Sequence, residues 1–255
     1  MGSYLWQNFL KDIKYIDFTL KRIEKYFSDP VIIEIWPWKW ALTKRLVNIA
    51  NKIYLFERDE TFKNILQDIV WDKGEITLWD FLEQDLQSFA AKHSLELNNV
   101  CVVGNLPYYI TSPIFRKLFV ENNIFKYGIF MIQKEVGEKI KTDAENKSYL
   151  RRLVNYAYDV KYLKNVPAKA FNPAPKVDSC LVEFTKKDKN PDIDFQKFQI
   201  LLDEISWYKR KTLNKISKLL SKREISLNIP ESLWSKRIQE LNRADMKIIL
   251  ENLEK

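Results

Sequence analysis

The feature that most constrains the fold of this sequence is a regular alternation of short apolar runs with amphipathic helical runs. The apolar runs are rich in β-branched residues and have the length of buried strands, whereas apolar residues in the intervening runs recur every three or four positions. Strands are predicted at 31–35, 53–56, 76–78, 100–105 and 129–133, and helices at 13–27, 42–49 and 62–69. Such alternation predicts an α/β fold with a mostly parallel, doubly wound sheet.

The pattern changes toward the C-terminus. Residues 160–163 and 179–184 read as later strands, and the polar stretch 186–194 interrupts the alternation. Residues 195–255 are rich in Lys, Leu and Ile and show helical spacing without strand signals. We therefore predict two domains, a sheet domain over residues 1–186 and a small all-α domain over residues 187–255.

Composition narrows the partners and the chemistry. The net charge is +8 and the pI is near 9.2, which favours a polyanionic partner, although a generally lysine-rich proteome would give the same balance. His93 is the single histidine and lies in a polar stretch, and Cys101 and Cys180 lack metal-ligand spacing. Neither a metal site nor a histidine-dependent triad is therefore expected, and the two thiols are expected to be buried and reduced. No uncharged apolar run approaches ~20 residues, and the N-terminus lacks a signal pattern, so we expect a cytoplasmic protein.

A loop follows the predicted strand that ends at Asn105. It carries one amide and two aromatic side chains in the run Asn105-Leu106-Pro107-Tyr108-Tyr109. Pro113 stands where a helix is expected to begin, a position at which its missing N–H costs little. Ligands of open α/β sheets bind outside the carboxyl ends of the strands. The loop is therefore a candidate site for a flat ligand that forms hydrogen bonds.

Two acidic residues follow neighbouring predicted strands. Glu57 ends the second strand, where a carboxylate commonly accepts hydrogen bonds from both ribose hydroxyls. The alternative to this ribose-binding role is an ordinary solvated charge beside Arg58. Asp80 follows the third strand and could accept the amine of an adenine ring that packs on Phe81 or Leu82. A turn or helix-capping role for Asp80 is equally compatible with the spacing.

The loop resembles the signature of methyltransferases that act on exocyclic amines. Its longer form, from Asn105 to Pro113, is similar to the ribosomal RNA adenine dimethyltransferase family of the KsgA type. Further segments match that family in order. They are Gln7-Asn8-Phe9-Leu10, Glu34-Ile35, Ala41-Leu42-Thr43, Gln133-Lys134-Glu135-Val136, Asn172 to Ser179, and Arg210-Lys211-Thr212-Leu213.

The resemblance implies a Rossmann-like class I methyltransferase domain, S-adenosylmethionine as cofactor, and two adjacent adenines near the 3′ end of small-subunit rRNA as substrate. It implies an immature small ribosomal subunit as partner of a monomeric enzyme. The resemblance assigns cofactor binding to Asn8, Leu10, Trp36, Glu57, Asp80 and Asn105, and catalysis to Asn105, Leu106, Pro107 and Tyr108. It assigns base stacking to Tyr108 and Phe171, and RNA contacts to Lys176, Lys209, Arg210 and Lys211.

Physical chemistry adds detail and alternatives to these roles. The Asn105 side-chain carbonyl and the Leu106 backbone carbonyl can each accept a hydrogen bond from one N–H of the amine. Catalysis is then chiefly the positioning of the amine against the methyl group. Phe171 could equally be a core aromatic, and any single lysine could be a solvated charge. Two other functions stay open: an Erm-type enzyme acting on large-subunit rRNA, which the Tyr109 to Pro113 match disfavours, and a non-catalytic RNA-binding assembly factor.

Tryptophan stands at five positions where the family has glycine. These are Trp6, Trp36, Trp38, Trp40 and Trp79. Glycine there allows positive φ and a close approach of the backbone to the cofactor, so three indoles within five residues should abolish the cofactor turn. The chain has only 5 glycines and as many as 8 tryptophans, whereas average usage of about 7% would give roughly 18 glycines.

One mechanism would explain both the excess of tryptophan and the deficit of glycine. If UGA encodes glycine in the source organism but is read as tryptophan, only glycine positions change. Trp71, Trp207 and Trp234 could be further instances. The hypothesis is that the native protein carries glycine at most of these sites, and its alternative is genuine tryptophan in a diverged, inactive relative.

Overall fold

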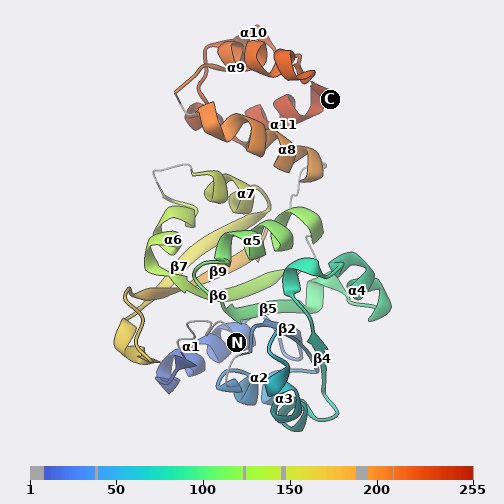
Figure 1. The fold of residues 1–255 in the computed structure, drawn as a ribbon, viewed down its shortest axis with the longest axis vertical. Coiled ribbons are helices and arrows are strands. Elements are labelled where there is room, and N and C mark those ends of the chain that lie inside the picture. The colour runs from blue at the N-terminus through green and yellow to red at the C-terminus, as the bar shows by residue number, and fades with distance from the viewer. Residues whose placement is uncertain are drawn as a thin grey trace.

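The computed structural model describes residues 9–37, 40–122, 125–144, 148–187, 195–208 and 210–254. The central strands are β2 (Val31–Ile35), β3 (Lys52–Glu57), β4 (Gly74–Leu78), β5 (Val100–Asn105), β6 (Tyr127–Gln133), β7 (Tyr158–Val166) and β9 (Ser179–Lys186). They form one seven-stranded sheet in the order β4-β3-β2-β5-β6-β9-β7 (Figure 1). The first five in chain order run parallel, and β9 is antiparallel to both neighbours. The predicted doubly wound sheet is confirmed.

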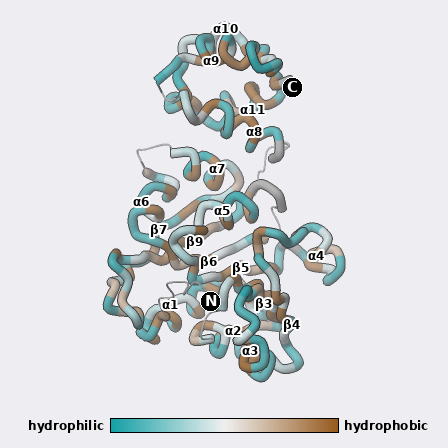
Figure 2. Tube along the Cα trace, in the orientation of Figure 1, coloured by the Kyte–Doolittle hydropathy of each residue, from teal (hydrophilic) through white to brown (hydrophobic). Residues whose placement is uncertain are grey.

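The apolar runs are continuous because both faces of the sheet are covered. Alternate residues of one strand enter different buried clusters: in β5, Val100 and Val102 join one cluster, and Cys101 and Val103 join the other. Figure 2 shows hydrophobic segments along the strands and the helices beside them. Cys101 and Cys180 are both buried free thiols, as expected.

Helices from different parts of the chain cover the two faces. Buried residues of α1 (Ile13–Glu24), α2 (Thr43–Ile49) and α3 (Lys63–Val70) belong to the cluster with Cys101. Buried residues of α4 (Leu86–Lys92), α5 (Thr111–Arg116), α6 (Lys134–Ile140) and α7 (Tyr149–Ala157) belong to the cluster with Val102. The chain winds outward through β2, β3 and β4 and returns to β5 beside β2. That reversal is the topological switch point at which ligands of such sheets bind.

A buried carboxylate ties α1 to the sheet. Glu183 of β9 has no exposed surface, and it accepts hydrogen bonds from the Arg22 guanidinium of α1 and from the Tyr127 hydroxyl, the latter at 2.6 Å. A buried carboxylate is tolerated only when it is paired and hydrogen-bonded. The arrangement fixes α1 and, through the chain, the segment 9–12 that precedes it.

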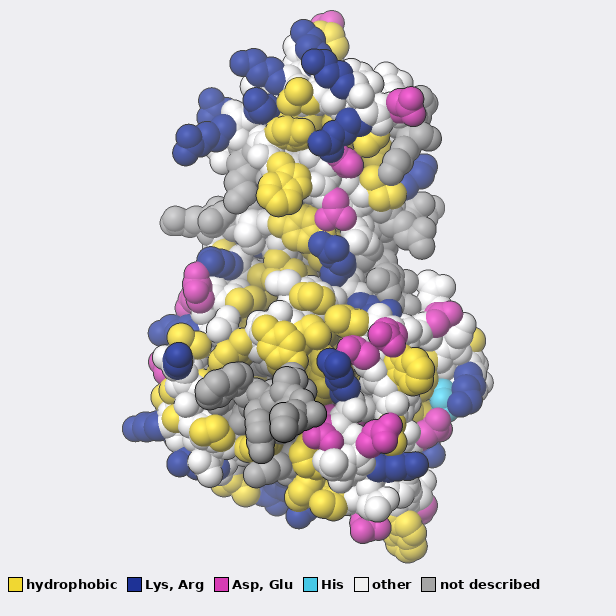
Figure 3. Space-filling model, in the orientation of Figure 1, with side chains coloured by type: hydrophobic (Ala, Val, Ile, Leu, Met, Phe, Trp, Pro, Cys, Tyr) yellow, Lys and Arg dark blue, Asp and Glu magenta, His cyan; other side chains and the backbone are white. Residues whose placement is uncertain are grey.

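The C-terminal part is built on α8 (Phe195–Ile205), α9 (Leu213–Leu220), α10 (Glu231–Trp234) and α11 (Arg243–Glu251), with its own hydrophobic cluster. Leu153 and Tyr156 of α7 pack into that cluster as well. Figure 3 shows Lys and Arg side chains gathered over these helices. The predicted helical C-terminal part is confirmed, and it also contains one short strand pair that was not predicted, β10 (Ser226–Leu227) with β11 (Leu253–Glu254). Two-residue strands are too short to leave a period-two pattern.

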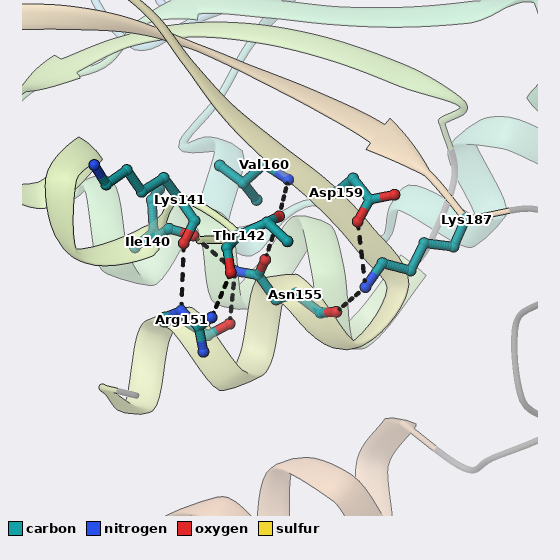
Figure 4. A network of polar contacts seen from close by, with 8 residues as sticks. All are labelled: Ile140, Lys141, Thr142, Arg151, Asn155, Asp159, Val160 and Lys187. Atoms are coloured by element: carbon teal, nitrogen blue, oxygen red, sulfur yellow. Dashed lines mark hydrogen bonds and ion pairs between the residues drawn. The ribbon is translucent and has the colours of Figure 1, made fainter. Parts of the chain in front are cut away.

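Helix α7 is held by a polar network on its other side (Figure 4). The Thr142 hydroxyl donates to the Asn155 side-chain oxygen at 2.6 Å and accepts the Val160 N–H at 2.7 Å. The Asn155 amide donates to the Ile140 carbonyl at 2.7 Å, and Lys187 Nζ donates to the Asn155 carbonyl at 2.7 Å. These bonds join α6, α7 and β7 beside the predicted boundary between residues 186 and 187. That boundary remains a proposal.

Among the residues described, no helix has the length and apolar character needed to cross a bilayer.

Candidate cofactor and base-binding site

Four of the predicted site residues lie at one edge of the sheet. Trp36 follows β2, Glu57 ends β3, Asp80 follows β4 and Asn105 ends β5. The parallel register places Ile35 opposite both Phe56 and Gly104, and Glu57 opposite Leu78. The carboxyl ends of these strands therefore meet at the switch point, as the sequence predicted.

A cavity opens at this edge. Its volume is about 70 Å³, and its lining includes Leu10, Glu34, Trp36 and Asn105. Glu57 and Asp80 do not line it. Asn8, predicted beside Leu10, lies outside the described residues. Among the described residues, no group of three or more His, Cys, Asp or Glu side chains is placed to hold a metal ion.

Glu34 was predicted only as part of a matching motif, without a role of its own. It is 1% exposed and lines the cavity. The pKa of Glu34 is raised to about 8, chiefly by burial; the Thr43 hydroxyl lowers it, and the neighbouring charge of Glu57 contributes to the rise. A carboxylate inside the apolar run Val31–Ile35 was the signal that could have identified it.

Glu57 is oriented by the backbone that follows it. Its Oε1 accepts the N–H groups of Arg58 at 2.8 Å and Asp59 at 2.9 Å, and the residue is 2% exposed. Two fixed donors on one oxygen hold the carboxylate in a single orientation, which suits a group that must accept two hydroxyl protons.

Asp80 has the capping role that the sequence left open. Its Oδ1 accepts the Leu82 N–H at 3.0 Å at the start of a short 3₁₀ helix, Phe81–Glu83. Its Oδ2 lies 3.6 Å from Arg58 Nη1. Phe81 is buried in the cluster that also contains Trp36. Recognition of an adenine amine by Asp80 stays a prediction.

The loop after β5 is fixed by contacts to three other elements. The Leu106 N–H donates to the Met131 carbonyl of β6 at 3.0 Å, and the Pro107 carbonyl accepts the Thr111 hydroxyl of α5 at 3.0 Å. The Tyr108 hydroxyl lies 2.7 Å from the hydroxyl of Ser179 at the start of β9. Ser179, which is fully buried, was predicted only as part of a motif. The loop is therefore a preorganised platform with Asn105 at the cavity edge.

The other predicted aromatic lies in the core. Phe171 is 2% exposed and belongs to a short strand, β8 (Phe171–Asn172), that pairs with β1 (Phe9–Leu10) so that Leu10 faces Phe171. This burial favours the core-aromatic alternative, because stacking on a base would require β8 to open. The pairing nevertheless places the cofactor-side residue Leu10 next to the segment that leads to Lys176.

The predicted RNA contacts are solvent-exposed. Lys176 lies in the loop before β9, and Arg210 and Lys211 precede α9. Lys209 lies outside the described residues. Helix α9 buries Leu213, Ile216 and Leu220 and turns its lysines outward, in the region where Figure 3 shows basic side chains gathered. Basic groups on one exposed face are the electrostatic footprint of a nucleic-acid partner.

The tryptophans at expected glycine positions differ in burial. Trp36 is 5% exposed and belongs to the buried cluster of Leu106 and Phe81, the residues next to Asn105 and Asp80. Trp40 is half-buried, whereas Trp79 is 56% exposed. Trp6 and Trp38 lie outside the described residues. Of the described tryptophans at these positions, Trp36 is thus the one that is buried and lines the cavity.

Comparison with known proteins identifies the family of the chain. A family model described as ribosomal RNA adenine dimethylase matches residues 3–255. The chain is 31% identical over 248 residues to the ribosomal RNA small subunit methyltransferase A of Hydrogenobaculum sp., covering 97% of this chain and 91% of that protein. It is 34% identical over 250 residues to the protein of the same name from Ligilactobacillus salivarius, covering 95% and 82%.

Two solved structures share the fold. A dimethyladenosine transferase from Plasmodium falciparum superposes with a TM-score of 0.74 at 23% identity, covering 94% of this chain and 95% of the other. The 23S rRNA methyltransferase ErmE gives a TM-score of 0.69 at 19% identity, covering 97% and 100%. These likenesses establish a methyltransferase sheet with a helical C-terminal part.

Proposed function

The chain belongs to the ribosomal RNA adenine dimethylase family, and we propose that the protein dimethylates the N6 amines of two adjacent adenines near the 3′ end of small-subunit rRNA during ribosome biogenesis. The methyl donor in this proposal is S-adenosylmethionine. The observation that carries it is the fixed loop Asn105–Tyr108 at the edge of a cavity at the switch point of the sheet.

The chemistry asked of the loop is positioning. An adenine amine is a poor nucleophile because its lone pair is delocalised into the ring. The Asn105 side-chain carbonyl and the Leu106 backbone carbonyl each accept a hydrogen bond from one N–H of the amine, which favours tetrahedral geometry at nitrogen. Because Asn105 lines the cavity, an amine held there lies at the cavity edge. Holding reactants in this way can lower a barrier by several kcal/mol, on the order of 7–11, without a strong base.

Tyr108 is the stacking platform in this proposal. Enzymes that modify a base inside a duplex must take it out of the stack and hold it against aromatic or apolar side chains. Burial raises the pKa of the Tyr108 hydroxyl, so the side chain stays neutral, and its bond to Ser179 fixes the ring. Pro107 restricts the backbone between Asn105 and Tyr108.

The rRNA is proposed to lie across the basic C-terminal face. Arg210 and Lys211 precede α9, and Lys176 follows β8 on the sheet domain. Contacts of this kind neutralise phosphates and fix the register of the RNA, while the loop selects the base. Large-subunit rRNA is a less supported substrate, because the named relatives are small-subunit enzymes and ErmE resembles the chain in fold alone.

The polar groups at this edge suit S-adenosylmethionine in their chemistry, whereas the cavity beside Trp36 is small. Glu57 is oriented to accept hydroxyl protons, and Leu10 and Asn105 line the cavity. Cofactor sites generally measure about 300–1,000 Å³, whereas this cavity measures about 70 Å³ and Trp36 lines it. Trp36 narrows the part of the site that lies beside Leu10 and Asn105. This observation favours a second candidate function for the chain as written, that of an RNA-binding assembly factor without catalysis.

The test uses immature small subunits as substrate and radiolabelled S-adenosylmethionine. Three proteins are compared: the chain as written, a five-glycine variant in which Trp6, Trp36, Trp38, Trp40 and Trp79 are each replaced by Gly, and the five-glycine variant with Asn105→Ala. We expect methylation of small-subunit adenines by the five-glycine variant alone, with a loss of about 100-fold on Asn105→Ala. Label on large-subunit rRNA, or an undiminished rate with Asn105→Ala, would overturn the proposal. Equal rates for the first two proteins would overturn the steric argument instead.

A further inference from the structure

The backbone of this chain places tryptophan where other chains place glycine. Five described residues other than glycine have positive φ, and three of them are tryptophans: Trp36 at 57°, Trp40 at 51° and Trp71 at 42°. The remaining two are Ser94 and Glu224, and none of the described glycines has positive φ. Glycine is the default residue at positive φ because side chains with a Cβ clash there.

Trp71 shows the conflict away from the cavity. It joins α3 to β4 in a tight turn, in which the Lys73 N–H donates to the Val70 carbonyl at 2.9 Å. Trp71 is the second residue of that turn, with φ 42° and ψ −115°. These angles are near those of the first central position of a type II′ turn, where glycine dominates. The side chain is 79% exposed, so no packing compensates for the strained backbone.

Trp36 shows the same conflict inside the site. Its N–H donates to the Phe56 carbonyl at 2.9 Å, which extends the pairing of β2 with β3 by one residue, and its φ then turns positive. The chain at this point must bend sharply at the carboxyl end of β2. The indole that the bend carries lines the cavity, whose volume is about 70 Å³.

We infer that the protein made in its own cell carries glycine at positions 36, 40 and 71, because codons written here as tryptophan are read there as glycine. Reassignment of a codon changes a residue whether or not it is buried. The three positions agree with this, because their side chains range from 5% to 79% exposed while all three have positive φ. The same reassignment accounts for a chain of 255 residues with 5 glycines and 8 tryptophans. The inference rests on backbone angles and stands apart from the proposed function.

The direct test reads the residue itself. A tryptic digest of the protein purified from its own organism yields the peptide from Asn64 to Lys73, which contains Trp71 and no other tryptophan. Fragmentation should show glycine at position 71, and the gene should carry UGA at codons 36, 40 and 71. Tryptophan in the native peptide, or UGG at these codons, would overturn the inference.

A second test isolates the backbone from the indole. In recombinant protein, Trp71→Gly and Trp71→Ala both remove the indole, but Trp71→Ala retains a Cβ at positive φ. Trp207, 86% exposed and without positive φ, provides matched Gly and Ala variants. At position 71 the Gly variant should melt about 2–4 °C above the Ala variant, and at position 207 below it. The same order at both positions would refute the assignment of a glycine turn, whatever the methylation assay shows.

Discussion

Replacing Trp36 with glycine should give the chain a measurable affinity for S-adenosylmethionine. The indole is 5% exposed and lines a cavity of about 70 Å³, well below the roughly 300 Å³ at which cofactor sites begin. Removing it joins the space of the side chain to the cavity beside Asn105. The Glu57 carboxylate, proposed to accept the ribose hydroxyls, is already held in one orientation by two backbone N–H groups.

The stability change separates into two opposing effects. Loss of a buried aromatic side chain typically costs about 3–5 kcal/mol, and relief of a residue held at positive φ returns about 1–3 kcal/mol. We therefore expect ligand-free Trp36→Gly to be destabilised by about 2 kcal/mol. Ligand at a hundredfold excess over Kd should then add about 2.7 kcal/mol, which corresponds to a rise in Tm of roughly 5–10 °C.

Differential scanning fluorimetry and calorimetry with S-adenosylmethionine measure both effects. Trp79→Gly is the matched control, because Trp79 is 56% exposed and does not line the cavity. The chain as written and Trp79→Gly should show no ligand-dependent shift, whereas Trp36→Gly should. An equal shift in the chain as written would refute the reasoning that Trp36 closes the site.

Three further predictions concern the groups around the cavity and the RNA face. The pKa of Glu34 is raised to about 8 from an ordinary value of 4.5, so between these pH values the folded state binds more protons than the unfolded state. The free energy of unfolding should therefore fall as the pH rises from about 5 to 8. In urea titrations, Glu34→Gln should make the free energy of unfolding depend less on pH over this range. In the five-glycine variant, Ser179→Ala and Tyr108→Phe each break the same hydrogen bond and should lower kcat/KM about fivefold, with no further loss when they are combined; additive losses would show that the bond does not position the ring. Lys211→Ala should reduce the slope of log affinity for small-subunit RNA against log salt concentration by about 1. Lys63→Ala on α3 is the control and should leave that slope unchanged. If Lys211→Ala also left the slope unchanged, the C-terminal face would not be part of the RNA interface.

The sheet could be predicted because its strands are buried on both faces and therefore read as continuous apolar runs. The buried strand over residues 100–103 and its end near Asn105 could be predicted for that reason, and β5 spans Val100–Asn105. The C-terminal pair of β10 and β11 could not be predicted, because two residues carry no periodicity. The packing of Leu153 and Tyr156 against the C-terminal helices was equally hidden, since an amphipathic pattern names an apolar face without naming its partner.

The site was predictable in part for a related reason. Glu57 and Asn105 end parallel strands, and the order of parallel strands brings such ends together. Ser179 was not assigned a role, because its bond to Tyr108 joins residues 71 positions apart. The cavity volume also had no signal in the sequence, since it depends on the direction in which Trp36 projects.

The two halves of the site are built on separate supports, and this separation makes the tryptophans informative. The loop Asn105–Tyr108, which is proposed to bind the amine, is held by Met131 of β6, Thr111 of α5 and Ser179 of β9, and none of these contacts involves a tryptophan. The cofactor half depends on the bend after β2, where Trp36 stands. A change at position 36 should therefore alter cofactor affinity and leave base recognition intact. If RNA affinity in the absence of cofactor also changed with Trp36→Gly, the two halves would be coupled and the loop could not be treated as an independent platform.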